Sequence, residues 1–257
     1  MPDASSVADF YDQLALDYHR IYPDWDASMA RQGRALNAVI HAELGLDHAA
    51  VLDCSCGIGT QAIALSRRGH RVMGSDISRF AVARAVREAA LRGVSLPAAI
   101  ADMRHLPFRE HQFDAVLSAD NSLPHLLRSQ DVAAALEEMR RVLRSGGLLM
   151  VSTRPYDEIL KTRPTSTPPQ LSSSSHGRTI TFQLWNWHAD GEHYDLEHFQ
   201  LVSDAGHWNV HVRRTTYWAL SRKQLTQYAI DAGFTALAWK TPEESRFFQP
   251  ILTARAT

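Results

Sequence analysis

The stretch VLDCSCGIGT, residues 51–60, decides the fold class of this chain. An apolar run ends at Asp53, and Gly57 and Gly59 follow before a helical pattern opens at Thr60. This order predicts a buried strand, a tight turn and the start of a helix. Glycine has no Cβ, so the chain can turn tightly and a ligand can lie against its backbone. The free N–H groups at the start of the following helix suit a carboxylate or a phosphate group.

Short aliphatic runs alternate with amphipathic helical patterns on either side of this turn. The predicted strands are residues 49–55, 70–76, 95–102, 113–120 and 148–154, and the predicted helices between them include 60–69, 78–93 and 129–147. Such alternation specifies a parallel sheet that is covered by helices on both faces. The sequence therefore predicts an α/β fold with a doubly wound, Rossmann-like sheet.

The residues that end the strands are candidate site residues, because ligands of such sheets bind outside the carboxyl ends of the strands. These residues are Asp53, Asp76, Asp102, Asp120 with Asn121, and Arg154. The alternative is that a strand-end Asp only forms a turn or caps a helix, as Asp76 before Ile77 and Ser78 could do.

Two helical patterns precede the first strand, at residues 5–20 and from about residue 26 to Gly45. They predict an N-terminal helical lid, residues 1–46, that covers the glycine turn. The candidate ligand contacts in this lid are Tyr11, Tyr18, Trp25 and Arg31. The alternative is that the aromatic side chains form the core face of the helices and that Arg31 is a solvated charge.

The second half of the chain loses the helical rhythm. Residues 161–175 are rich in Pro, Ser and Thr and predict a mobile surface loop. Apolar and polar residues then alternate around Asp190-Gly191, which indicates a β-hairpin. We expect residues 161–219 to form the loop and an antiparallel insertion over the binding site. Residues 47–160 and 220–257 are expected to form the core, closed by a last helix and two strands.

Composition and charge exclude several classes of function. The formal net charge of −1 offers no basic surface for nucleic acid. The first residues lack the features of a targeting peptide and no apolar run is long enough for a membrane span, so we expect a cytoplasmic protein without a membrane partner. A monomer and a homodimer both remain open.

The Cys and His residues do not favour a disulfide or a metal site. Cys54 and Cys56 are separated by one residue, which would strain a disulfide, and a structural zinc site normally takes four ligands. His188, His193 and His198 are spaced five residues apart, so neighbours in this series point to opposite faces of a strand. We therefore expect no metal site.

Asp76 lies about twenty residues beyond the glycine turn, the distance at which an acidic side chain binds ribose hydroxyls. Nicotinamide dehydrogenases and enzymes that use S-adenosylmethionine share this feature. Ala62 stands at the third glycine position of the dinucleotide fingerprint, where alanine is tolerated, so the turn alone is compatible with both classes. The acidic residues Asp53, Asp76 and Asp102 and the Asp-Asn pair at 120–121 favour S-adenosylmethionine.

The chain resembles the class I S-adenosylmethionine-dependent methyltransferases over nearly its whole length. The resemblance is carried by VLDCSCGIGT, by GSDIS at 74–78 and by IADMRHLPF at 100–108. It implies that Gly57 and Gly59 approach the amino acid part of the cofactor and that Asp53 helps to hold it. It further implies a ribose site at Asp76 and Ile77 and an adenine site at Asp102 and Met103. We also expect cofactor contacts from Asp120 and from the lid residues Tyr11, Tyr18, Trp25 and Arg31, with Arg34 as an alternative to Arg31.

Two other segments are similar to the glycine and sarcosine N-methyltransferases. They are DNSLPHLL at 120–127 and STRPYDEIL at 152–160. The resemblance implies that Asn121 and His125 line the acceptor site and that Arg154, with Tyr156 nearby, binds the acceptor carboxylate. His125 is then a candidate base, and the alternative is a partly buried structural histidine. For Arg154 the alternative is a surface salt bridge.

The sequence therefore predicts an S-adenosylmethionine-dependent N-methyltransferase of a small amino acid or a related carboxylated amine. A guanidinium fork binds a carboxylate with two parallel hydrogen bonds and leaves the amine free to be aimed. The Trp- and His-rich insertion departs from the glycine and sarcosine group. It leaves open a larger natural-product amine, or an oxygen or carbon acceptor. A non-catalytic module that binds S-adenosylmethionine is the alternative from another class.

Overall fold

The computed structural model describes residues 4–174, 177–204 and 207–257. Residues 1–3 of the expected lid and Ser175 of the expected loop lie outside these ranges. The helices are α1 (Ala4–Leu14), η1 (Tyr18–Ile21), α2 (Trp25–Leu44), α3 (Thr60–Ser66), α4 (Arg79–Leu91), η2 (Leu123–His125), α5 (Ser129–Val142), α6 (Tyr156–Thr162), α7 (Arg222–Asp231) and α8 (Pro242–Ser245). The strands are β1 (Ala50–Asp53), β2 (Arg71–Asp76), β3 (Ala98–Ile100), β4 (Phe113–Ser118), β5 (Leu143–Ser152), β6 (Gln170–Ser174), β7 (Gly177–Trp187), β8 (His193–Asp204), β9 (His207–Trp218), β10 (Phe234–Lys240) and β11 (Ile251–Ala256).

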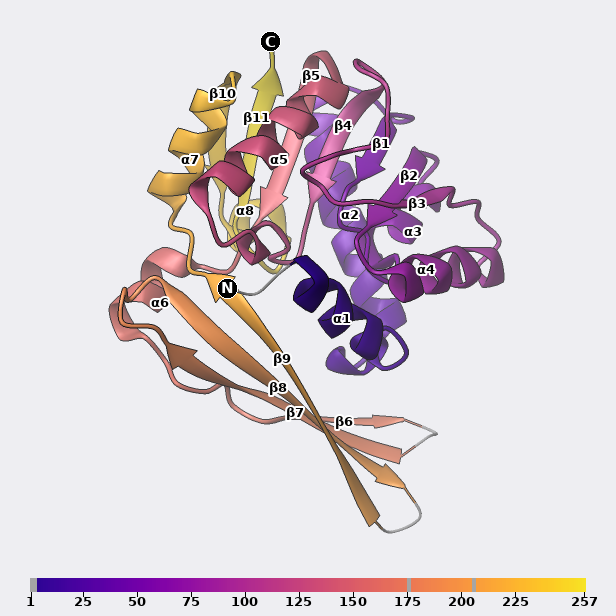
Figure 1. The fold of residues 1–257 in the computed structure, drawn as a ribbon. Helices are drawn as coiled ribbons and strands as arrows, with labels where there is room; N and C mark the ends of the chain where they lie inside the picture. The colour runs from indigo at the N-terminus through magenta and orange to yellow at the C-terminus, as the bar shows by residue number, and fades with distance from the viewer. Residues whose placement is uncertain (1–3, 175–176, 205–206) are drawn as a thin grey trace.

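Seven strands form the main sheet, in the order β10-β11-β5-β4-β1-β2-β3. Strands β1 to β5 are parallel, and β11 runs antiparallel to both β5 and β10. Successive residues of a strand point to opposite faces. Val51 of β1 accordingly packs with α2, α3 and α4, whereas Leu52 packs with α5 and α7 on the other face (Figure 1). The predicted doubly wound α/β fold is confirmed.

The strand order reverses at β1. The chain runs outward from β1 through β2 to β3 and then returns to β4 on the other side of β1. Loops that leave the carboxyl ends of β1 and β4 therefore diverge and leave room between them. The glycine turn follows β1, and the Asp120-Asn121 pair follows β4, so both lie at this point of reversal.

A second, antiparallel sheet contains β6, β7, β8 and β9 and extends away from the main sheet (Figure 1). The turn at Asp190-Gly191 joins β7 to β8 as the sequence predicted, and Gly191 has a φ of 71°. Residues 170–174, which we expected in a loop, form β6 against β7. An edge strand needs backbone pairing on one side only, so the Ser-rich composition did not reveal it.

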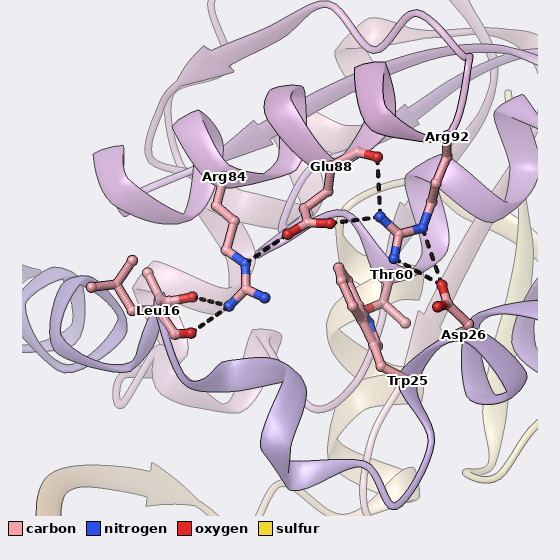
Figure 2. Close-up of polar contacts among 8 residues, drawn as sticks. Leu16, Trp25, Asp26, Thr60, Arg84, Glu88 and Arg92 are labelled. Atoms are coloured by element: carbon pink, nitrogen blue, oxygen red, sulfur yellow. Dashed lines mark hydrogen bonds and ion pairs between the residues drawn. The ribbon is translucent and has the colours of Figure 1, made fainter. Parts of the chain in front are cut away.

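Helix α4 anchors the N-terminal segment at two places (Figure 2). Arg84 donates hydrogen bonds to the carbonyl groups of Ala15 at 2.6 Å and Leu16 at 2.8 Å, just after α1. Arg92, the residue that directly follows α4, donates to Asp26 at 2.8 Å near the start of α2. Glu88 lies between the two arginines and pairs with both. The chain between these anchors carries η1 and is thereby held over the carboxyl ends of the strands.

Candidate active site

Two cavities lie at the carboxyl ends of the parallel strands. The first, of about 430 Å³, is lined by residues that follow β1, β2 and β3, including Gly57, Asp76 and Asp102. The second, of about 680 Å³, lies between the loops after β4 and β5, the lid and the antiparallel sheet. Tyr11 and Tyr18 line both cavities, so the lid forms the boundary between them.

The glycine turn forms one wall of the first cavity. Gly57 has a φ of 50°, and a Cβ added there would meet only the Tyr18 ring, at 3.5 Å. The carboxylate of Asp76 accepts hydrogen bonds from the backbone N–H of Gly57 at 2.8 Å and of Ser78 at 2.9 Å. Asp76, at the end of β2, therefore fixes the conformation of the glycine turn and also lines the cavity. Ile77 lies beside it in the lining.

Asp102 and Met103 line the same cavity after β3. The Asp102 carboxylate pairs with Arg104 at 2.6 Å, and Arg104 also contacts Asp131 at 2.9 Å. The hydrogen bonds from Arg104 hold the pKa of the Asp102 carboxyl below its usual value, against the opposing effect of burial. Asp102 is thus a fixed, ionised acceptor in the lining of the first cavity.

Gly59 and Asp53, which were predicted to contact the cofactor, lie outside the lining of both cavities. Gly59 has a φ of 91°, and a Cβ added there would approach Ile63 Cδ1 to 2.8 Å, so its glycine is required by packing against α3. Asp53 is fully buried beneath the turn. Its Oδ1 accepts from the Ser55 N–H at 3.4 Å, and its Oδ2 has no partner among the described residues. Burial raises the pKa of Asp53 to about 7.

The lid residues divide between the cavities and the core. Tyr11 and Tyr18 reach the cavities, and Arg31 lines the second cavity and not the first. Trp25 lines neither cavity. It is buried with its indole N–H donating to Thr60 Oγ1 at 2.9 Å and with the Arg92 guanidinium 4.7 Å from its ring (Figure 2). Trp25, expected to contact the cofactor, is thus placed in the core in this structure, because its side of α2 packs onto α3 and α4.

The loop after β4 enters the second cavity through two residues with left-handed backbones. Asp120 has a φ of 56° and Asn121 a φ of 67°, conformations that Asp and Asn tolerate better than most residues. Asn121 Oδ1 accepts from the backbone N–H of Arg154 at 3.1 Å, which joins this loop to the one after β5. Its buried Nδ2 has no partner among the described residues and remains available to a ligand.

Arg154 lies at the side of the second cavity nearest the antiparallel sheet. Its guanidinium donates to Tyr194 Oη at 2.8 Å and to Gln183 Oε1 at 3.1 Å. The rings of Trp185 and Tyr217 lie 4.8 and 5.1 Å from its Cζ. Within the described part of the chain, no carboxylate forms an ion pair with this arginine. The alternative that Arg154 forms a surface salt bridge is therefore not what the structure shows.

Tyr156 occupies a different place from the one predicted. It is buried outside both cavities, and its hydroxyl lies 3.0 Å from Tyr194 Oη. Tyr194 is the tyrosine that contacts Arg154 directly. Tyr156 thus supports the arginine from behind, because α6 turns its first residue toward the antiparallel sheet and away from the cavity.

His125 is enclosed and has contacts at both ring nitrogens. Its Nε2 lies 2.8 Å from Tyr11 Oη and its Nδ1 lies 3.3 Å from Thr215 Oγ1. Burial, with a smaller effect of Arg154, lowers the pKa of His125 to about 3. It lines the first cavity and not the second. A neutral imidazole with both nitrogens engaged favours the structural alternative over the role of base.

Several residues of the second cavity were missed from the sequence. They are Tyr22, Gln183, Tyr217 and Gln249, together with Tyr194 beneath Arg154. Tyr22 comes from the lid, Gln183 from β7 and Tyr217 from β9, and these elements meet only in the folded chain. Alternation along β7 and β9 places Gln183 and Tyr217 on definite faces, but it does not tell which face meets the core.

Comparisons with known proteins identify the central part of the chain. Residues 51–147 match a family described as a methyltransferase domain. The chain carries a methyltransferase domain. This confirms the resemblance found in the sequence, and S-adenosylmethionine is the cofactor of this domain.

The relatives of this methyltransferase domain differ in what they methylate. A glycine/sarcosine N-methyltransferase of Parasynechococcus marenigrum is 34% identical over 165 residues, 62% of this chain and 57% of the relative. A demethylmenaquinone methyltransferase of Thermobifida fusca is 34% identical over 150 residues, 57% of each. The chain thus spans somewhat over half the length of these curated relatives. The CcbJ methyltransferase of Streptomyces caelestis superposes with a TM-score of 0.78 over 100% of both chains at 19% identity, which shows a shared fold.

The residues of the first cavity fit this cofactor. Gly57 leaves the backbone of the turn open, Asp76 and Asp102 present carboxylate acceptors to the cavity, and Asp53 Oδ2 is an unpartnered buried acceptor beneath the turn. Elsewhere in the described residues, no group of three or more His, Cys, Asp or Glu side chains is placed to hold a metal ion. No helix among the described residues has the length and apolar character needed to cross a membrane.

Proposed function

We propose that the protein is an S-adenosylmethionine-dependent N-methyltransferase whose acceptor is an amine that also carries a carboxylate. The observation that carries this proposal is Arg154, a partly buried guanidinium in the wall of the second cavity that forms no ion pair with a carboxylate of the described residues. Buried charges are normally paired, because the desolvation of an isolated charge is unfavourable. A carboxylate of the acceptor would supply the missing partner.

The geometry around Arg154 suits a bound carboxylate. Its hydrogen bonds to Tyr194 and Gln183 engage two of the five guanidinium N–H donors, and both acceptors are neutral groups. The flanking Trp185 and Tyr217 rings fix the plane of the guanidinium. A fixed guanidinium plane gives the directional, two-point recognition that a carboxylate requires. A glycine/sarcosine N-methyltransferase among the relatives also supports an acceptor of this class.

The size of the second cavity favours an acceptor larger than glycine. Its volume of about 680 Å³ falls within the roughly 300–1,000 Å³ typical of sites for drug-sized ligands. The amino acid end of the cofactor would occupy a part of it next to Tyr11 and Tyr18. Phe182, Trp185 and Phe247 line the remainder and would contact an apolar or aromatic portion of the acceptor.

The residues of the chain would contribute orientation more than covalent chemistry. S-adenosylmethionine, when bound, supplies an activated methyl group for in-line transfer. Arg154 would fix the carboxylate end of the acceptor, and Asn121 Nδ2 would donate to one of its oxygens. With that end held, the amine would face the boundary formed by Tyr11 and Tyr18. Correct placement of two reactants alone accelerates such a reaction strongly.

A panel of amines tests this proposal. Glycine, sarcosine, L-phenylalanine, L-tryptophan and their decarboxylated counterparts would be incubated with the protein and S-adenosylmethionine. Product would be identified by mass spectrometry, and S-adenosylhomocysteine release would give kcat/KM. We expect methylation of carboxylated amines, with larger side chains preferred. Equal kcat/KM for amines with and without the carboxylate would contradict the proposal.

Variants of Arg154 separate acceptor binding from cofactor binding. Arg154→Met should raise KM for a carboxylated acceptor while leaving the Kd for S-adenosylhomocysteine nearly unchanged. Arg178→Met is the matched control, because Arg178 lies over Trp208 on the antiparallel sheet and lines neither cavity. If both variants leave KM unchanged, the carboxylate site is wrong.

A second candidate is a methyltransferase of a larger natural product without a carboxylate. The volume and aromatic lining of the second cavity favour it, since aromatic faces bind planar and cationic groups. The same panel, extended to aminosugars and polycyclic phenols, distinguishes the two candidates. Binding of S-adenosylmethionine without transfer to any member would instead favour the non-catalytic module.

A further inference from the structure

Asp120 is the only carboxylate among the described residues that line the second cavity. The other charged residues of this lining are the arginines Arg31, Arg154 and Arg246. Asp120 and Arg154 interact electrostatically within this lining, so the cavity presents its one carboxylate together with the positive charge of Arg154. This pair is the complement of a zwitterion, a molecule with a carboxylate at one end and an ammonium group at the other.

The position of the Asp120 side chain is fixed by neighbours from three parts of the chain. Tyr22 of the lid donates to Oδ2 at 3.1 Å, and Gln249 before β11 donates to Oδ1 at 3.4 Å. The Asp120 backbone N–H donates to Ser152 Oγ at 2.8 Å, and Ser152 in turn donates to Gln249 Oε1 at 2.9 Å. The left-handed backbone of Asp120 is thereby held by a closed set of contacts. A strained conformation kept in this way is typical of functional sites.

Asp120 lies close to the boundary between the two cavities. Its charge acts on Tyr11 and Tyr18, which line both cavities, and on Tyr217 at the edge of the second. The methyl group to be transferred must cross this boundary, and the acceptor nitrogen must approach it from the second cavity. Asp120 is therefore on the side from which the nitrogen arrives.

We propose that Asp120 binds the ammonium group of the acceptor and removes one of its protons before transfer. This inference rests on the proposed function, because it assumes an amine acceptor in the second cavity. One N–H bond of the ammonium group breaks and its proton passes to a carboxylate oxygen of Asp120. The freed nitrogen lone pair forms the new N–C bond, and the electron pair of the broken C–S bond remains on the sulfur, which becomes a neutral thioether.

The surroundings suit this role better than those of His125. Burial raises the pKa of the Asp120 carboxyl, which makes it a stronger base than an exposed Asp. The hydrogen bonds from Tyr22 and Gln249 and the charge of Arg154 lower this pKa and so oppose the effect of burial in part. His125 lines the first cavity with both ring nitrogens engaged, whereas Asp120 lines the second cavity, where the acceptor would bind. A carboxylate also retains lone pairs for an ammonium group after accepting from Tyr22 and Gln249.

Cofactor analogues test this role without knowledge of the acceptor. Sinefungin carries a protonated amine where S-adenosylmethionine carries its methyl group, so it places an ammonium group at the boundary. Isothermal titration would give the Kd of sinefungin, S-adenosylmethionine and S-adenosylhomocysteine. We expect the wild-type protein to prefer sinefungin to S-adenosylhomocysteine. Asp120→Asn should reduce this preference about tenfold and leave the Kd of S-adenosylhomocysteine within about twofold.

Two outcomes would overturn the proposal. One is an unchanged sinefungin preference in Asp120→Asn. The other is an equal loss of affinity for sinefungin and S-adenosylmethionine, which would mean that Asp120 attracts the cofactor charge and does not bind a nitrogen. Asp195→Asn is the matched control, because this exposed Asp of β8 lines neither cavity.

A second measurement covers the case in which Asp120→Asn does not fold. In the wild-type protein, the sinefungin preference should decline as the pH falls and Asp120 becomes protonated, and a preference that does not change with pH would contradict the role. No methyl transfer is measured in either experiment. A failure of the amine panel therefore overturns the carboxylated acceptor alone, and a failure here overturns the role of Asp120 alone.

Discussion

Arg84 of α4 provides a direct test of how the lid is held. We expect Arg84→Met to lower both the free energy of unfolding and the affinity for S-adenosylhomocysteine. Arg84 is 8% exposed and donates to the carbonyl groups of Ala15 and Leu16 at 2.6 and 2.8 Å. It also pairs with Glu88 at 3.3 Å (Figure 2). Methionine keeps much of the apolar stem but none of these contacts.

The expected loss of stability is about 3 kcal/mol. A hydrogen bond that involves a charged group contributes roughly 1.5–3 kcal/mol, and Arg84 makes two of them to the lid backbone. Removing one partner of a buried ion pair destabilises by about 3–5 kcal/mol when the other charge is left alone. Glu88 retains Arg92 at 2.6 Å, so the loss of the Glu88 contact adds little.

The affinity for S-adenosylhomocysteine should fall because the same contacts hold Tyr11 and Tyr18 against the first cavity. If about 1.4 kcal/mol of the lost stabilisation of the lid is also lost from the binding free energy, the Kd rises about tenfold. Urea unfolding would give the change in stability, and isothermal titration would give the Kd. Arg87→Met on the same helix is the control, because Arg87 is exposed and should change stability by less than about 0.5 kcal/mol.

Two results would refute this reasoning. If Arg84→Met and Arg87→Met unfold at the same urea concentration, the buried contacts of Arg84 do not stabilise the fold. If Arg84→Met is less stable but binds S-adenosylhomocysteine with the wild-type Kd, the anchoring of the lid is not coupled to the cofactor cavity.

Three further predictions concern buried groups near the first cavity. Because burial raises the pKa of Asp53 to about 7, the folded chain keeps a proton between about pH 4 and pH 7 that the unfolded chain releases. The free energy of unfolding should therefore fall by up to roughly 4 kcal/mol as pH rises through this window, and Asp53→Asn should flatten the slope; equal slopes in urea unfolding would contradict this. Gly59→Ala should destabilise by about 2 kcal/mol in the same assay, from a φ of 91° and the contact with Ile63, and a change below about 0.5 kcal/mol would count against that packing. Tyr11→Phe should cost about 1–2 kcal/mol, because it leaves His125 Nε2 buried without its partner, and wild-type stability would show that this hydrogen bond contributes nothing.

Strand-end residues were the most accessible part of the site from the sequence. Asp76, Asn121 and Arg154 were chosen because the carboxyl ends of parallel strands meet at one edge of a sheet. The structure places all three in the linings of the two cavities. Asp53 is also at a strand end but is fully buried beneath the glycine turn, outside the linings of both cavities.

Residues on the lid and on the antiparallel sheet were harder to assign. From the sequence, Tyr11 and Trp25 could each belong to the core face of a helix or contact a ligand. In the structure, Tyr11 lines the first cavity, whereas Trp25 is buried where α2 packs on α3 and α4. Tyr156 was expected next to the acceptor from the resemblance of residues 152–160 to the glycine and sarcosine N-methyltransferases, whereas Tyr194, far away in sequence, contacts Arg154. Contacts between distant elements depend on the register and twist of a sheet, which local patterns do not encode.

The glycine turn at residues 51–60 and the alternation around it determined the fold and predicted where the cofactor would bind. These features are local, because a strand, a turn and the start of a helix are set by neighbouring residues. The tertiary structure alone decided what surrounds the acceptor. It brought Asp120, Arg154 and the aromatic residues of the lid and the antiparallel sheet around one cavity, because their burial depends on elements that are distant in sequence and meet only when the chain is folded.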